Sequence, residues 1–140
     1  MFGWLKKEKN TPVDHTEVLE GAATIILVQL KASPKTESFD EICHSNFVRG
    51  YFVGVIDAAL RNSGASQEDQ GKYLALVMEG HAILMGDKKI GKFVMDSYSQ
   101  QDESDFKRGL NTGWQEYLDF LKGVNPAPRK LLDFFKSSQS

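Results

Sequence analysis

The 140-residue sequence has a single cysteine, Cys43, so it cannot form a disulfide within the chain. Its charge is nearly balanced, with 17 Lys and Arg against 19 Asp and Glu, which leaves no net positive field to attract a nucleic-acid backbone. No apolar run approaches the roughly 20 residues of a membrane-spanning helix, and the first residues lack the pattern of a secretory leader. We therefore expect no nucleic-acid partner, no transmembrane segment and a cytoplasmic location.

Proline is scarce and lies near the ends of the sequence, at positions 12, 34, 126 and 128. The interval between positions 34 and 126 is therefore free of this helix breaker. A chain of this length with 41% hydrophobic and 26% charged residues suits one soluble domain. Residues 1–12 show no regular apolar period and are expected to form a flexible N-terminal arm, followed by a helical domain over residues 13–140.

Apolar residues recur at every third or fourth position, which predicts amphipathic helices. The first is expected over about residues 14–31, and its apolar middle suggests that it is the central helix of the fold. The second is expected to begin at Ser38, which has the capping-box spacing with Glu41, and to continue to residue 62. Further helices are expected over about residues 66–86, 90–98, 104–123 and 128–135, the first of them capped at Ser66 with Asp69.

Two short apolar runs, residues 51–56 and 82–85, are also compatible with β-strands. Both lie within longer helical patterns that begin with capping residues, so we predict helices at both places. The predicted fold class is all-α, a single-domain bundle of five or six helices.

Twelve glycines are many for a helical protein, because each glycine inside a helix costs about 0.5–1 kcal/mol relative to alanine. Gly50 and Gly54 lie one turn apart on one helix face, and Gly109 and Gly113 have the same spacing. Small residues in this arrangement let another helix approach closely. That helix could belong to the same chain or to a partner, so Gly50 and Gly54 are candidate interaction residues.

The sequence contains an incomplete phosphate-binding loop. Residues 86–92 fit its first seven positions, but Phe93 stands where a Ser or Thr would bind magnesium, and no strand is expected before the loop. We interpret this segment as a lysine-rich turn between two helices. We therefore reject a nucleotide hydrolase.

Glu41 and His44 have half of the spacing used by di-iron sites, but no second copy of the motif exists. A single metal held by these two residues and either Glu79 or Glu116 is the alternative. Cys43 lies on an apolar helix face, where a thiol is not activated. We expect no catalytic residue, no metal site, no cofactor and no enzymatic activity.

Two sets of residues are candidates for binding. The first is a group of apolar and aromatic side chains that could line a pocket around a histidine: Met78, His81, Met85, Trp114 and Tyr117. The second consists of large apolar residues that lie among basic residues near the two ends of the sequence: Phe2, Trp4, Phe134 and Phe135. Residues 1–10 could also contact an anionic membrane surface with this composition.

Residues 50–58 resemble a helix of small bacterial immunity proteins of the secreted-effector kind, but the chain lacks their secretory signal and paired cysteines. This resemblance assigns no functional residue. We expect a non-catalytic helical protein–protein interaction module of the adaptor, regulator or inhibitor type, which binds a protein partner or self-associates as a homodimer. The alternative is a helical small-molecule-binding protein with an apolar pocket near His81 and Trp114.

Overall fold

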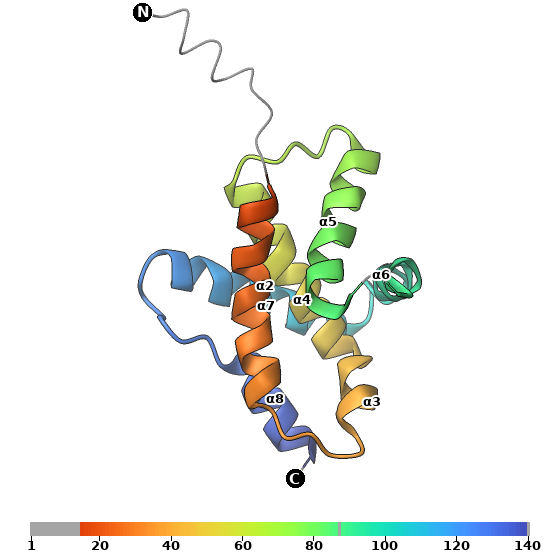
Figure 1. Cartoon of the computed structure of the whole chain (residues 1–140), viewed down its shortest axis with the longest axis vertical. Coiled ribbons are helices and arrows are strands. Elements are labelled where there is room, and N and C mark those ends of the chain that lie inside the picture. Colours follow the sequence, from red (N-terminus) through yellow and green to blue (C-terminus); the bar gives the residue numbers. More distant parts are fainter. Residues whose placement is uncertain (1–14, 87, 140) are drawn as a thin grey trace, which may run out of the picture.

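The computed structural model describes residues 15–86 and 88–139, and its secondary structure over these residues is entirely helical (Figure 1). Seven helices pack into one unit there, where five or six were predicted. In chain order they are α2 (Thr16–Ala32), α3 (Phe39–Cys43), α4 (Asn46–Asn62), α5 (Gln70–Met85), α6 (Ile90–Ser99), α7 (Ser104–Leu121) and α8 (Lys130–Gln139).

Residues 51–56 lie within α4 and residues 82–85 within α5, which confirms that both runs are helical. None of the seven helices is long and apolar enough to cross a membrane. The predicted arm over residues 1–12, with Phe2 and Trp4, lies outside the part of the chain that the structure describes.

The helix predicted from Ser38 to residue 62 is in fact two helices. α3 ends at Cys43, and α4 begins at Asn46 after a turn at His44 and Ser45. The Ser45 backbone is extended, with ψ 155°, and its hydroxyl donates a hydrogen bond to the Ile42 carbonyl (2.6 Å). The apolar positions keep helical spacing on both sides of this turn, so periodicity did not reveal it.

The predicted capping residues need correction too. α3 begins directly after Ser38, but the Ser38 side chain makes no capping hydrogen bond. α5 begins after Asp69, whose carboxylate accepts a hydrogen bond from the Lys72 amide (3.1 Å). Ser66 lies before this cap and accepts a hydrogen bond from the Glu68 amide (3.2 Å). The capping-box spacing thus located the start of α3 without supplying its hydrogen bond, and it placed the start of α5 too early.

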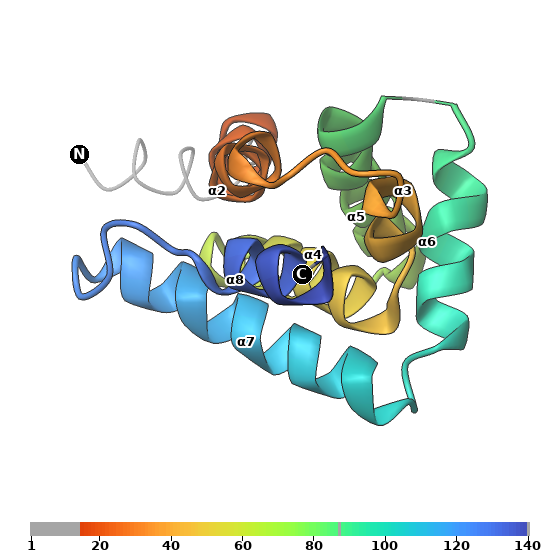
Figure 2. The ribbon, with the colours of Figure 1, turned by 90° about the horizontal axis from the view of Figure 1, so that it is seen from below.

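The central helix is α4, although the sequence suggested the first helix. Thirteen of the seventeen residues of α4 are buried. α4 packs against α2 and, more extensively, against α7, so that it lies between them (Figure 2). Val28, in the apolar middle of α2, is instead 61% exposed. Glycine explains why α4 is more buried than the apolar middle of α2. A helix face made of glycines lets α7 pack directly on the α4 backbone, so this face is buried although it has little apolar side-chain surface.

The backbones of α4 and α7 touch where two glycine pairs meet: Gly50 and Gly54 on α4, and Gly109 and Gly113 on α7. A Cβ atom on Gly50 would lie 2.1 Å from the Phe106 carbonyl oxygen, and one on Gly109 would lie 2.1 Å from the Phe47 carbonyl oxygen. Each helix therefore occupies the space that a side chain on the other would need. Because α7 covers Gly50 and Gly54, the close-packing face of α4 is occupied within the chain.

A buried polar network fixes α8 to the rest of the fold. Glu116 of α7 is 5% exposed and accepts hydrogen bonds from the Tyr51 hydroxyl (2.7 Å) and the Lys130 amide (3.1 Å). Gln29 of α2 donates to the Tyr51 oxygen (2.9 Å) and accepts from the Leu132 amide (3.1 Å). Side chains of two other helices thus provide acceptors for amides at the start of α8, where a helix has no acceptors of its own.

We expect Tyr51→Phe to lower the free energy of unfolding by about 1–3 kcal/mol, because Glu116 loses a donor and Gln29 loses an acceptor inside the core. Urea unfolding followed by circular dichroism measures this change. Tyr117→Phe is the matched control: Tyr117 is also buried, and its hydroxyl makes no hydrogen bond within the described structure. Equal, small effects of the two substitutions would contradict the network.

Candidate anion-binding site

The C-terminal interaction candidates pack against the core. Phe135 is fully buried and stacks on Phe39 of α3, with 5.0 Å between ring centroids. Phe134 is half-buried and stacks on Phe47 of α4 at 4.4 Å. Both rings therefore hold α8 in place.

The five predicted pocket residues lie in several environments. Met78 is half-buried beside the cluster that contains Val77, and Tyr117 is buried in the main core. Trp114 is half-buried, with the Arg61 guanidinium 5.5 Å from its ring centroid. Two candidates belong to one region of the fold: His81 is fully buried, and Met85 is 39% exposed at the end of the same helix.

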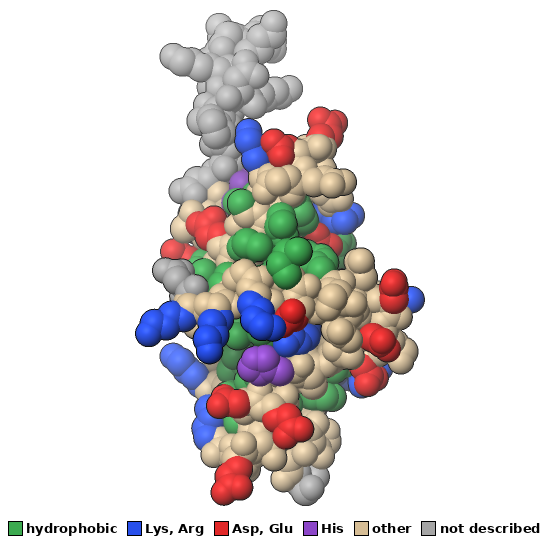
Figure 3. Space-filling view, turned by 90° about the vertical axis from the view of Figure 1, so that its right-hand side faces the viewer, with side chains coloured by type: hydrophobic (Ala, Val, Ile, Leu, Met, Phe, Trp, Pro, Cys, Tyr) green, Lys and Arg blue, Asp and Glu red, His purple; other side chains and the backbone are tan. Residues whose placement is uncertain are grey.

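Met85 lines a pocket of about 630 Å³ between the turn after α3, the end of α5 and the first turns of α6. Its lining residues are His44, Arg49, Met85, Lys88, Lys89, Lys92, Phe93 and Asp96. Four of these eight are lysine or arginine, and one is acidic. Figure 3 shows this region as a group of Lys and Arg side chains beside a histidine. A smaller hollow of about 270 Å³ adjoins it and shares His44, Arg49 and Asp96.

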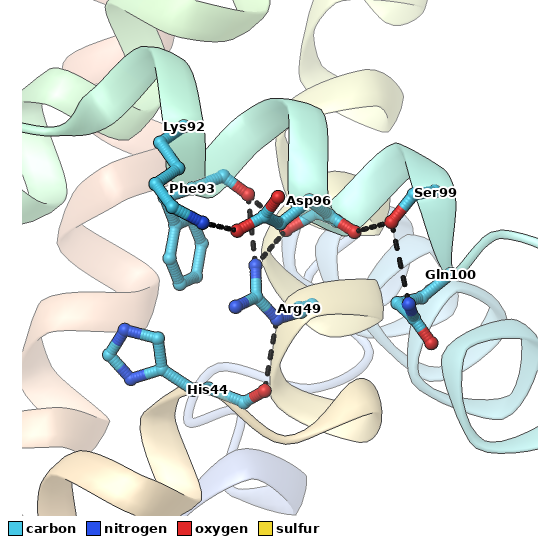
Figure 4. Close-up of polar contacts among 8 residues, drawn as sticks. His44, Arg49, Lys92, Phe93, Asp96, Ser99 and Gln100 are labelled. Carbon is cyan, nitrogen blue, oxygen red and sulfur yellow. Dashed lines mark hydrogen bonds and ion pairs between the residues drawn. The ribbon is translucent and has the colours of Figure 1, made fainter.

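Arg49 of α4 forms the inner wall of the pocket and is only 8% exposed. Its Nε donates a hydrogen bond to the His44 carbonyl, and its Nη1 donates to the Phe93 carbonyl and the Ser97 hydroxyl, each at 2.9 Å (Figure 4). The guanidinium carbon lies 4.3 Å from the centroid of the Phe93 ring. These contacts fix the guanidinium in one orientation.

The three acceptors that Arg49 is hydrogen-bonded to are all neutral. No carboxylate of the described chain forms an ion pair with it, and its Nη2 has no hydrogen-bond acceptor there. Burial lowers the pKa of Arg49, and the nearby Asp96 carboxylate opposes this shift. Arginine stays charged in proteins, so a positive charge is held at the pocket wall without an anion bonded to it. Hydrogen bonds and the Phe93 ring stabilise part of this charge, and an anion in the pocket would stabilise it further.

Lysines and the start of α6 form the rim of the pocket. Lys92 pairs with Asp96 at 2.7 Å, and this hydrogen bond lowers the pKa of Asp96. Lys88 and Lys89 are exposed and precede α6, with Lys89 in the left-handed region at φ 62°. The first turn of a helix has amide groups without acceptors and a partial positive charge. The lysine side chains and the start of α6 therefore both favour an anion near this rim.

His44 borders the pocket beside Phe93, with 5.5 Å between the ring centroids. Its Nδ1 lies 2.7 Å from the Asp40 carbonyl oxygen. A carbonyl only accepts hydrogen bonds, so Nδ1 carries a proton. The other ring nitrogen is the one available to a ligand.

Within residues 15–86 and 88–139, no three His, Cys, Asp or Glu side chains are placed to hold a metal ion. Of the two glutamates considered for a metal with Glu41 and His44, Glu79 accepts a hydrogen bond from α2 and Glu116 belongs to the α8 network. Burial raises the pKa of Cys43 to about 11, with a further contribution from Asp40. A nucleophilic cysteine needs the opposite shift.

Arg49 was not predicted as a functional residue, although one signal was present. It is the only charged residue in the apolar run 47–56, a position where charge is unusual unless it serves a contact. The sequence alone indicates only a lysine-rich turn between two helices for residues 86–92. Only the packing of α6 against α4 brings these lysines to Arg49, which lies about forty positions earlier.

The chain matches no family model, no curated protein and no solved structure in the three comparisons made.

Proposed function

We propose that the chain is a non-catalytic binding module that holds an anionic group of its partner in the basic pocket between α4, α5 and α6. The observation that carries this proposal is Arg49, a buried guanidinium with one end open to the pocket and no anion bonded to it. The interaction role expected from the sequence is kept. Its recognition site is placed at the pocket instead of at Phe134 and Phe135.

The chemistry of the lining supports binding more than catalysis. Its eight residues include no serine, threonine or cysteine, and four of them are lysine or arginine against one carboxylate. Charges of one sign in a hollow attract an oppositely charged ligand and raise its association rate. Lining of this kind suits recognition, where the ligand leaves unchanged.

A free small anion is the second candidate for the ligand. The volume of about 630 Å³ lies in the range of small-molecule sites. Met85, predicted from the sequence as a pocket residue, lines it. His81 does not line it but packs against Phe93, with 5.9 Å between ring centroids. This second candidate retains the small-molecule-binding role given as the alternative from the sequence, but its site is not near Trp114.

The proposal is tested by titrating ¹⁵N-labelled protein with sulfate at constant ionic strength. We expect saturable shifts of the amide signals at the start of α6 and of the Arg49 Nε–H signal. The double variant Lys88→Gln/Lys89→Gln should weaken this binding about tenfold, because both cations leave the rim.

Lys122→Gln is the control, since Lys122 is exposed at the end of α7 and does not line the pocket. It should bind sulfate as the wild type does. Shifts that do not saturate, or that are the same in the double variant and the wild type, would contradict an anion site here.

A further inference from the structure

We infer that the group held in this pocket is a dianionic phosphate monoester whose organic part lies against Met85 and Phe93. This inference rests on the proposed function and narrows it from anions in general to one chemical class.

The charge of the lining favours a dianion. Lys92 is paired with Asp96, whereas Arg49, Lys88 and Lys89 form no ion pair with any described residue. A carboxylate would neutralise one of these three charges. A phosphate monoester carries nearly two negative charges above its second pKa of about 6, so it matches the lining better.

The geometry of Arg49 disfavours a carboxylate as well. A planar carboxylate binds arginine best through two parallel hydrogen bonds, which use two neighbouring nitrogens of the guanidinium. Here Nε and Nη1 already donate to protein oxygens, and Nη2 alone is available. A tetrahedral phosphate needs only one bond from Arg49, because its other oxygens can face the lysines of the rim.

The pocket also has room for more than a phosphate group. Beyond the charged atoms, its walls include Met85, which is 39% exposed, and the small accessible part of Phe93. Apolar surface of this kind gains free energy when an organic group covers it. A phosphorylated metabolite and a phosphorylated side chain of a protein share the chemistry required.

Calorimetric titration of the full chain at about pH 8 compares phenyl phosphate, benzoate and inorganic phosphate, so that the phosphate probes are dianions. We expect phenyl phosphate to bind about tenfold more tightly than benzoate and about threefold more tightly than inorganic phosphate. Equal affinities for phenyl phosphate and benzoate would overturn the inference and leave the anion site intact. If sulfate and all three probes fail to bind, the proposed function fails as well.

A phosphotyrosine peptide distinguishes the two sources of the phosphate. Binding tighter than that of phenyl phosphate would indicate a protein partner, because residues beside the phosphotyrosine then add contacts. Equal or weaker binding would indicate a free small ligand. Either result supports the phosphate inference, provided that the unphosphorylated peptide does not bind; equal binding of that peptide would overturn it.

Asp96→Asn provides a test that depends on the charge of the ligand. Removing this carboxylate should strengthen phenyl phosphate binding about fivefold and benzoate binding only about twofold, because electrostatic repulsion is proportional to ligand charge. Asp133→Asn is the matched control, since it also breaks an exposed (i, i+4) ion pair and Asp133 does not line this pocket. Weaker phosphate binding in Asp96→Asn, or an equal gain for both ligands, would contradict a dianion at this position.

Discussion

Replacing Gly109 with alanine is expected to lower the free energy of unfolding by more than about 4 kcal/mol, enough to unfold a typical domain of this size. The added Cβ would lie 2.1 Å from the Phe47 carbonyl oxygen, a distance that no pair of real atoms of this kind can keep. The atom it meets belongs to the backbone of α4, so no side-chain rotation can relieve the contact. α4 and α7 would have to separate, and α4 contributes much of the core.

Gly21→Ala is the matched control for this substitution. Gly21 is also inside a helix, but its Cβ would meet no atom within 4 Å. Alanine has the higher helix propensity, so this variant should gain about 0.5–1 kcal/mol. Urea unfolding followed by circular dichroism measures both variants. If Gly109→Ala were as stable as Gly21→Ala, α4 and α7 would be farther apart than the structure shows.

The glycine spacing illustrates which parts of the fold can be predicted from a sequence. A helix face with Gly50 and Gly54 can be recognised locally, because the residues that define it are four positions apart. The partner of that face is α7, more than fifty residues later, and nothing in the local pattern identifies it. The same limit explains why the first helix was predicted to be central. Its apolar residues are visible in the sequence, whereas the contacts that enclose α4 are long-range.

The candidate site also has one part that can be predicted from the sequence and another that depends on the fold. Lys88, Lys89 and Lys92 are close in sequence: Lys88 and Lys89 lie in the predicted turn before α6, whereas Lys92 lies in the first turn of α6. A role in binding can be assigned to these lysines only in the folded structure. There the buried Arg49 guanidinium forms the wall of a pocket, and the lysines form its rim. This arrangement requires α6 to pack against α4, which apolar periodicity does not specify. The motif considered from the sequence is a phosphate loop between a strand and a helix, and it does not address anion binding by another geometry.

His81 is a buried histidine whose environment favours the neutral ring. It is fully buried in α5, and its Nδ1 lies 2.9 Å from the Val77 carbonyl, so this nitrogen carries the proton. Its Nε2 is buried without a hydrogen-bond partner in the described structure. Burial lowers the pKa of His81 from 6.5 to about 4, and the positive charge of Arg49 adds to this effect. Protonation would place a second cation beside Arg49 inside the core.

The protein should therefore lose stability as the pH falls from about 6.5 to about 4. Over this range the histidine of the unfolded chain takes up a proton while folded His81 stays neutral, so the unfolded state binds more protons. The expected loss is about 2 kcal/mol between pH 7.5 and pH 5. Urea unfolding at these two pH values measures it in the wild type and in His81→Leu. Other titrating groups are common to both proteins, so the difference between the two pH effects isolates His81. An equal loss of stability in His81→Leu would show that the folded protein does not keep this histidine neutral.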